Sequence, residues 1–137
     1  MIYDLSSPIS DRLRVWPGDT PPSREVQLDM ARGDNITLST LRSTDHLGSH
    51  VDGPNHYGLD SPGVESWPLD LFIGPCQVIR VAVPPGELIR VDHLRQVPID
   101  SPRLLIASGS NPDPESFRED FNALDPDLGP FLGRQGV

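Results

Sequence analysis

The segment HLGSHVDGPNH, residues 46–56, concentrates side chains that can bind a metal ion. It holds three of the chain's four histidines, His46, His50 and His56, together with the carboxylate Asp52. A single histidine is more often a surface or core residue than a ligand, but this grouping favours a shared role. We therefore interpret the segment as a metal site, and the alternative is a set of unrelated surface or core histidines.

The spacing within this segment limits how its side chains can meet. In an extended chain, His50 and Asp52 point to the same side, roughly 6.6 Å apart at ~3.3 Å per residue. His46 would lie about 13 Å from His50 in a straight strand, which is too far for ligand bonds of about 2 Å. It can join the site only if the chain bends, and Gly48 permits a bend. A second turn at Gly53-Pro54 would bring His56 back towards the metal.

The types of these side chains indicate which metal and which reaction to expect. Imidazole and carboxylate together suit Zn²⁺, with Mn²⁺ or Fe²⁺ as alternatives. Three protein ligands and one open position are typical of a hydrolytic site, because zinc lowers the pKa of a bound water to about 7. A further histidine beside such a site, here His56, is suited to shuttle protons.

The elements that position this segment are predicted to be mainly strands. Residues 25–30 and 35–41 alternate apolar and polar side chains, which indicates half-buried strands. The apolar runs CQVIRVAV (76–83) and RLLIAS (103–108) are core material, and the first of them reads as a strand with Cys76 as a buried small side chain. A short strand is also expected at residues 1–5.

Helices are predicted only in the later part of the chain. Asp92 is a candidate N-cap for one, and Pro114 is a plausible first helical residue of another. A third would begin at Asp125-Pro126 and end at Gly136. Strands first and helices later predict an α+β fold, in which helices cover one face of a mainly β core.

Composition limits the functional classes. A length of 137 residues suits one domain spanning 1–137, and 16 prolines predict short elements joined by long loops. A net charge of −9 argues against nucleic acid or an anionic membrane as a partner. No run of apolar residues reaches membrane-spanning length and the first residues lack a signal peptide, so we expect a cytoplasmic protein with a small-molecule substrate.

The motifs resemble those of a known family. HLGSHVDGPNH is similar to the His-x-Gly-Thr-His-x-Asp-x-Pro-x-His signature of the metal-dependent cyclase family, which includes bacterial kynurenine formamidase (arylformamidase). Ser49 stands where threonine is usual. The likeness continues through YDLSSPIS, VWPGDTP, GPCQVIRV and FLGRQGV in the family's order, so it covers essentially the whole chain.

This resemblance implies roles for individual residues. His46, His50 and Asp52 would be metal ligands, with Asp52 bridging two zinc ions, and His56 would be the proton donor and acceptor. Trp16 would line the substrate pocket, although a loop anchor packed on the core is an equal alternative. The resemblance also implies a swivelling β/β/α fold and a homodimer or larger assembly.

The chain departs from the family's pattern at its end. Gly136 reads as a helix end and Val137 as the start of a strand, so we expect the fold to be incomplete at its C-terminus. The family continues beyond this point and supplies another histidine and a glutamate to the metals. No histidine follows His93, and Glu115 and Glu119 lie too early to match. The ligand set of a second metal is therefore incomplete within these residues.

Three functional hypotheses follow from the sequence. The first is a zinc-dependent hydrolase of amide or formamide bonds, with N-formyl-L-kynurenine, an intermediate of tryptophan catabolism, as the candidate substrate. The second is a catalytically incomplete fragment or a non-catalytic metal-binding subunit. The third is a non-haem Fe(II) oxygenase, in which His50, Asp52 and a distal His93 would form the triad of two histidines and one carboxylate. It leaves His46 and His56 without a role.

Overall fold

The computed structural model describes residues 1–137, and the chain forms two compact units. Unit 1 comprises Met1–Val64 together with Asp113–Phe117. Unit 2 comprises Glu65–Pro112 together with Arg118–Val137. The expectation of a single domain over 1–137 stays a prediction, and each unit is described by itself below.

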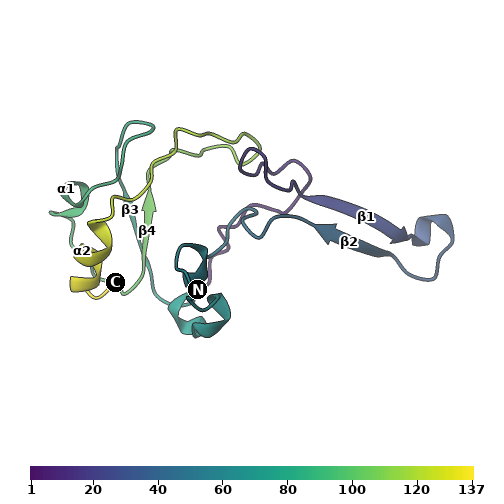
Figure 1. The fold of residues 1–137 in the computed structure, drawn as a ribbon, viewed down its shortest axis with the longest axis horizontal. Helices are drawn as coiled ribbons and strands as arrows, with labels where there is room; N and C mark the ends of the chain where they lie inside the picture. Colours follow the sequence, from purple (N-terminus) through teal and green to yellow (C-terminus); the bar gives the residue numbers. More distant parts are fainter. The chain divides into compact units, whose positions relative to one another are not determined.

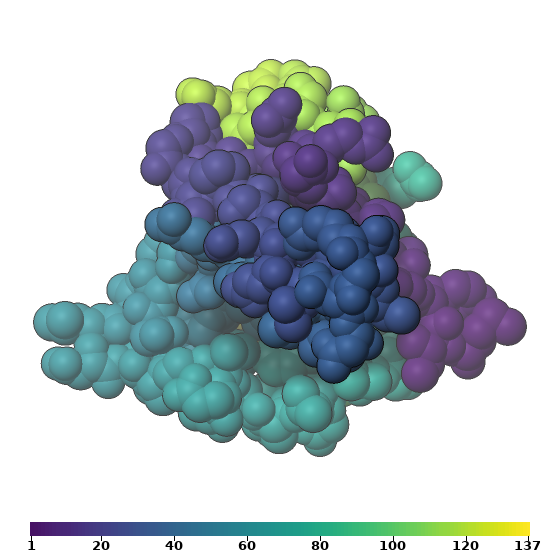
Figure 2. Space-filling view, turned by 90° about the vertical axis from the view of Figure 1, so that its right-hand side faces the viewer, coloured from purple at the N-terminus to yellow at the C-terminus, as the bar shows by residue number.

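Unit 1 contains an antiparallel hairpin of the strands β1 (Ser23–Leu28) and β2 (Leu38–Arg42) (Figure 1). Both strands overlap the ranges predicted from their alternating side chains, but nearly all of their residues are exposed, so the expectation that the strands are half-buried is wrong. The register shifts between Val26 and Leu28, where β1 carries a bulge. The tip of the hairpin, blue in Figure 2, is exposed, and Met30 there keeps 65% of its surface in solvent.

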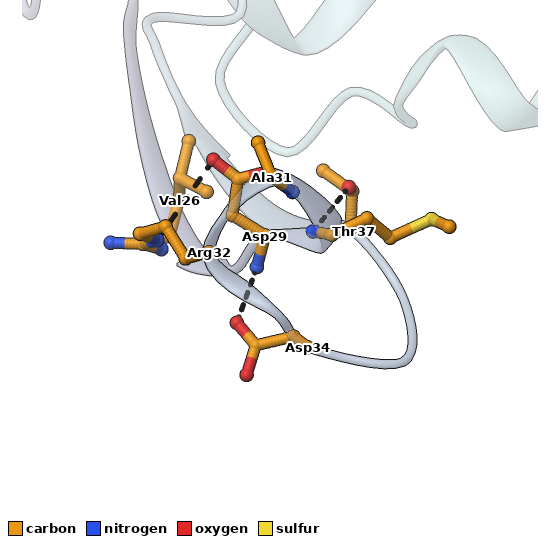
Figure 3. A network of polar contacts seen from close by, with 7 residues as sticks. Val26, Asp29, Ala31, Arg32, Asp34 and Thr37 are labelled. Carbon is orange, nitrogen blue, oxygen red and sulfur yellow. Dashed lines mark hydrogen bonds and ion pairs between the residues drawn. The ribbon is translucent and has the colours of Figure 1, made fainter.

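Polar contacts define the turn at the tip of the hairpin, which contains the 3-10 helix η1 (Met30–Arg32) (Figure 3). The Asp29 carboxylate accepts the N–H of Ala31 at 2.9 Å, so Asp29 caps the helix N-terminus. The Asp29 N–H donates to the Asp34 carboxylate at 2.6 Å. Gly33 ends the helix at φ 98°, a left-handed conformation that glycine adopts without steric cost. These contacts fix the length of the hairpin loop.

Unit 2 contains a parallel pair of strands, β3 (Gln77–Arg80) and β4 (Leu104–Ala107). Its helices are α1 (Val91–Leu94) and α2 (Leu128–Arg134). Two further short 3-10 helices, η3 (Val64–Ser66) and η4 (Leu69–Leu71), precede β3. None of the helices has the length and apolar character needed to cross a membrane.

One apolar cluster joins the helices of unit 2 to its sheet. Its fully buried side chains are those of Leu94 in α1 and Leu128 in α2, and they pack with Ile79 of β3. In the view of Figure 1 both helices lie to the same side of β3 and β4. The remaining buried members are Val81, Val83 and Ile89. The elements are therefore short strands and helices around a small core, as the α+β prediction requires.

Leu94 is expected to contribute most to this core, because none of its surface is exposed. Leu94→Ala should lower the free energy of unfolding by about 2–5 kcal/mol, since it removes buried methyl groups and leaves a cavity. Urea unfolding followed by circular dichroism measures the change. The matched control is Leu105→Ala on β4, where 45% of the side chain is already exposed. An equal loss in both variants would contradict the assignment of this core.

Several predicted elements differ from the structure. Residues 1–5 form no strand, and no helix begins at Pro114. Helix α1 begins after Arg90 instead of Asp92, and the Asp92 carboxylate pairs with Arg95 at 3.0 Å. Cys76 precedes β3 and is exposed, so the expectation of a buried cysteine is wrong. The helix predicted to end at Gly136 is present as α2.

Candidate metal centre

The histidine segment lies in unit 1 and bends where the sequence predicted. Gly48 has φ 61°, a left-handed conformation that turns the chain between His46 and His50. The neighbouring Leu47 is buried, as is Leu13, whose side chain lies beside Gly48. The bend therefore lies beside buried apolar side chains, while the histidines on either side remain exposed.

The bend brings three potential ligand atoms together. The Nδ1 atom of His46 lies 3.2 Å from Nε2 of His50 and 2.9 Å from Oδ1 of Asp52. Nε2 of His50 lies 3.4 Å from the same carboxylate oxygen. Ligand atoms around a tetrahedral zinc at about 2.0–2.2 Å lie roughly 3.3–3.5 Å from one another. The three atoms therefore need to move little to hold one ion.

The protonation of His50 supports this interpretation. Its Nδ1 lies 2.9 Å from the carbonyl oxygen of Gly48, which can only accept a hydrogen bond, so Nδ1 carries the proton. In a neutral imidazole Nε2 is then a bare acceptor, and it faces the carboxylate oxygen of Asp52. Two acceptors at this distance favour a cation between them. The hydrogen bond to Gly48 also orients the ring, as the outer partner of a metal-bound histidine does.

His56 lies beside these three residues but does not join their ligand atoms. It ends the 3-10 helix η2 (Pro54–His56), whose first residue is a proline preceded by Gly53. The His56 ring packs on that of His46, with 4.4 Å between ring centroids, and on Tyr57 at 4.3 Å. The turn at Gly53-Pro54 thus returns the third histidine to the group, in a position suited to proton transfer at its edge.

Gly53 allows the chain to pass close to another part of the same loop. A Cβ atom added to Gly53 would lie 2.6 Å from the backbone nitrogen of Val64 and 2.7 Å from the side-chain oxygen of Asn55. The backbone there is held by a hydrogen bond from the Asn55 N–H to the carbonyl of Pro62. A side chain at position 53 therefore has no room, although its φ of −75° suits any residue.

Gly53→Ala should lower the free energy of unfolding of the metal-free protein by roughly 1–3 kcal/mol, because the added methyl group must displace backbone atoms. Gly133→Ala is the matched control, since no atom lies within 4 Å of a Cβ added there within α2. That substitution should raise stability by up to about 1 kcal/mol through the higher helix propensity of alanine. Urea unfolding in the presence of a chelator measures both, and a stabilising Gly53→Ala would contradict the close approach.

Trp16 lies in a turn of unit 1 and packs edge to face on Phe117, with 5.5 Å between ring centroids. Its exposed fraction of 56% is high for a residue that anchors a loop to a core. The Asp19 N–H donates to the Trp16 carbonyl at 2.9 Å and closes the turn. Sequence reasoning missed Phe117, because no local pattern brings a residue about a hundred positions away against Trp16.

His93 and the later carboxylates do not add to the group. The Nδ1 atom of His93 accepts the N–H of Arg90 at 2.9 Å at the start of α1, which gives this histidine a structural role. Glu115 forms an ion pair with Arg12 at 3.1 Å. Among residues 1–137, the grouping of three metal-binding side chains is that of His46, His50 and Asp52.

The chain is similar to kynurenine formamidases of two bacteria. The kynurenine formamidase of Bordetella petrii is 33% identical over an alignment of 137 positions that covers 99% of this chain and 65% of that protein. The kynurenine formamidase of Geobacillus thermodenitrificans is 31% identical over 135 residues, 98% of this chain and 64% of that protein. The chain thus spans about 65% of the length of these relatives.

Two solved structures share the fold. One, described as a potential metal-dependent hydrolase with cyclase activity, has a TM-score of 0.77 at 22% identity. The match covers 98% of this chain and 63% of that chain. The other, described as a predicted metal-dependent hydrolase from Bacillus stearothermophilus, has a TM-score of 0.74 at 21% identity. That match covers 98% of this chain and 64% of that chain. These likenesses confirm the predicted cyclase-like α+β fold.

The family model described as "Putative cyclase" matches residues 3–137, which include every residue of the candidate metal centre. This match confirms the resemblance inferred from HLGSHVDGPNH and the flanking motifs. The chain belongs to the cyclase family.

Proposed function

We propose that this chain carries the metal site of a metal-dependent hydrolase that cleaves an amide or formamide bond. The proposal rests on the arrangement of His46, His50 and Asp52, whose ligand atoms lie 2.9–3.4 Å apart. Two imidazoles and one carboxylate suit Zn²⁺ best, and Mn²⁺ is the alternative. The names of the curated relatives support the same class of reaction.

The protein's own residues divide the chemistry between them. His46, His50 and Asp52 hold the metal, which when bound polarises a carbonyl oxygen and lowers the pKa of water. His56 is the general base and acid: it accepts a proton from the attacking water and returns it to the leaving nitrogen. Its ring lies against His46, so the proton acceptor and the ligands share one edge of the site.

The substrate that fits best is an aryl formamide such as N-formyl-L-kynurenine, with kynurenine and formate as products. Trp16 and Phe117 offer an edge-to-face aromatic pair on which an aryl ring can pack. The relatives named kynurenine formamidase favour the same substrate. We also propose a cytoplasmic homodimer that uses zinc, in which Asp52 would be shared between two ions if a second ion binds.

A non-catalytic metal-binding subunit is the second candidate. It is favoured by the presence of one group of three metal-binding side chains among residues 1–137. Three ligands are enough to bind an ion, whereas the family's second ion requires a further histidine and glutamate. The Fe(II) oxygenase hypothesis has less support, because the His93 that it needs is occupied at the start of α1.

The test is hydrolysis of N-formyl-L-kynurenine by the complete gene product that contains residues 1–137, purified with zinc. We expect formate release that is lost on treatment with a chelator and restored by Zn²⁺ or Mn²⁺. Zinc bound without hydrolysis of any aryl formamide would favour the non-catalytic subunit. Hydrolysis that survives complete removal of metal would overturn the proposal.

A further inference from the structure

The loop that carries Trp16 is tied to the histidine segment by backbone and side-chain hydrogen bonds. The N–H of Thr44 donates to the carbonyl of Thr20 at 3.2 Å, which joins two loops of unit 1. On the Thr20 side, the Asp19 carboxylate accepts the N–H of Thr20 at 2.7 Å. Thr44 is therefore fixed in place two residues before the candidate ligand His46.

The Thr44 hydroxyl connects Asp19 to the backbone of His46. Its oxygen accepts the N–H of His46 at 3.3 Å, and the Asp19 carboxylate, which also accepts the Thr20 N–H, is the acceptor to which its proton points. A hydroxyl has one proton and two lone pairs, so it can make both contacts at once. Asp19 and Thr44 are both half-buried, which limits competition from water. The result is a continuous chain of contacts from a carboxylate to the residue that presents a metal-binding nitrogen.

The electrostatics of Asp19 agree with this arrangement. The hydrogen bond from the Thr44 hydroxyl, followed by that from the Thr20 N–H, holds the pKa of Asp19 below its ordinary value.

We propose that Asp19 and Thr44 are positioning residues for the metal centre: the Asp19 carboxylate orients the Thr44 hydroxyl, which holds the backbone of His46 where its Nδ1 meets His50 and Asp52. This inference rests on the proposed metal site. Neither residue touches the ion. They act as outer partners that fix a ligand, and loss of such a partner typically weakens metal binding by about 10–100-fold.

The test measures zinc affinity in the complete gene product by competition with a chromophoric chelator. Thr44→Val keeps the shape of the side chain but removes the hydroxyl, and Asp19→Ala removes the acceptor. Both should weaken zinc binding by about 10–100-fold. Thr44→Ser keeps the hydroxyl and should restore the parent's affinity. Asp19→Asn keeps an acceptor without the charge and should fall between the parent and Asp19→Ala.

Thr40→Val is the matched control, because it deletes a threonine hydroxyl that instead accepts the Gln27 side chain on the hairpin. It should leave zinc affinity unchanged. A merely structural role for Thr44 would appear as reduced thermal stability of the metal-free protein. The positioning role predicts in addition an altered Co²⁺ absorption spectrum, since the geometry around His46 changes.

Two outcomes separate this inference from the proposal on which it rests. If the parent binds zinc and Thr44→Val and Asp19→Ala bind it equally well, the positioning role is wrong and the metal site stands. If the parent itself binds no zinc, the metal site is wrong, and the positioning role falls with it.

Discussion

Asp52→Ala is expected to weaken zinc binding by more than about 100-fold, the upper end of what loss of an outer partner costs. The Asp52 oxygen is the single carboxylate atom in the group, 2.9 Å from the ring nitrogen of His46 and 3.4 Å from that of His50. Alanine leaves two neutral imidazoles, which offer the ion no negative charge. Competition with a chromophoric chelator, together with zinc content after dialysis, measures the loss.

Asp45→Ala is the matched control for this prediction. Asp45 is also an exposed acid, adjacent to His46 in the sequence, but it is not part of the group that could hold a metal. The Asp45→Ala variant loses the same charge from the same loop, and we expect its zinc affinity to remain close to the parent's. If both variants lose affinity to the same degree, the general negative charge of the loop binds the ion, and Asp52 is not a specific ligand.

The convergence of the histidine segment could be predicted from the sequence because the cause is local. His50 and Asp52 are two residues apart, and glycine at position 48 is the residue most able to adopt the positive φ that the bend requires. Period-two alternation likewise located both strands of the hairpin. These features depend on near neighbours in the chain, and neighbours are what a sequence pattern records.

The failure at Pro114 arises because distant residues decide the outcome. No helix forms at Pro114, because the carbonyl of Pro114 accepts the N–H of Arg14 and that of Glu115 accepts the Arg14 side chain. Both carbonyls therefore accept hydrogen bonds from Arg14 and not from N–H groups of a following helical turn. At α1 the cause is local: the His93 ring accepts the Arg90 N–H three residues away, and the helix starts before Asp92. Arginine and histidine are not the residue types of the usual capping box, so the sequence pointed to Asp92 instead.

The contact that holds Thr44 beside the metal centre could not be predicted from the sequence either. The hydrogen bond between the backbones of Thr44 and Thr20 spans 24 positions of sequence between two irregular loops. Neither alternation nor helical spacing relates such loops to one another. The sequence therefore predicts the candidate ligands of the metal centre, but it does not predict the residues that hold those ligands in place.

His56→Ala in the complete gene product is expected to lower kcat for formamide hydrolysis by about 10²–10⁴-fold, the usual contribution of a general acid and base. Zinc content should stay at the parent's level, because His56 does not join the converging ligand atoms of the other two histidines and Asp52. The ring centroids of His56 and His46 lie 4.4 Å apart, which places a proton acceptor beside the site without making it a ligand.

Steady-state kinetics and metal analysis on the same preparation separate this role from its alternatives. His93→Ala is the control, since it removes the chain's remaining histidine, whose ring accepts the Arg90 N–H in α1. It should lower stability slightly and leave kcat unchanged. If His56→Ala instead lost zinc along with activity, His56 would be a ligand. If it kept both zinc and the parent's turnover, another group would transfer the proton, and the catalytic assignment of His56 would be wrong.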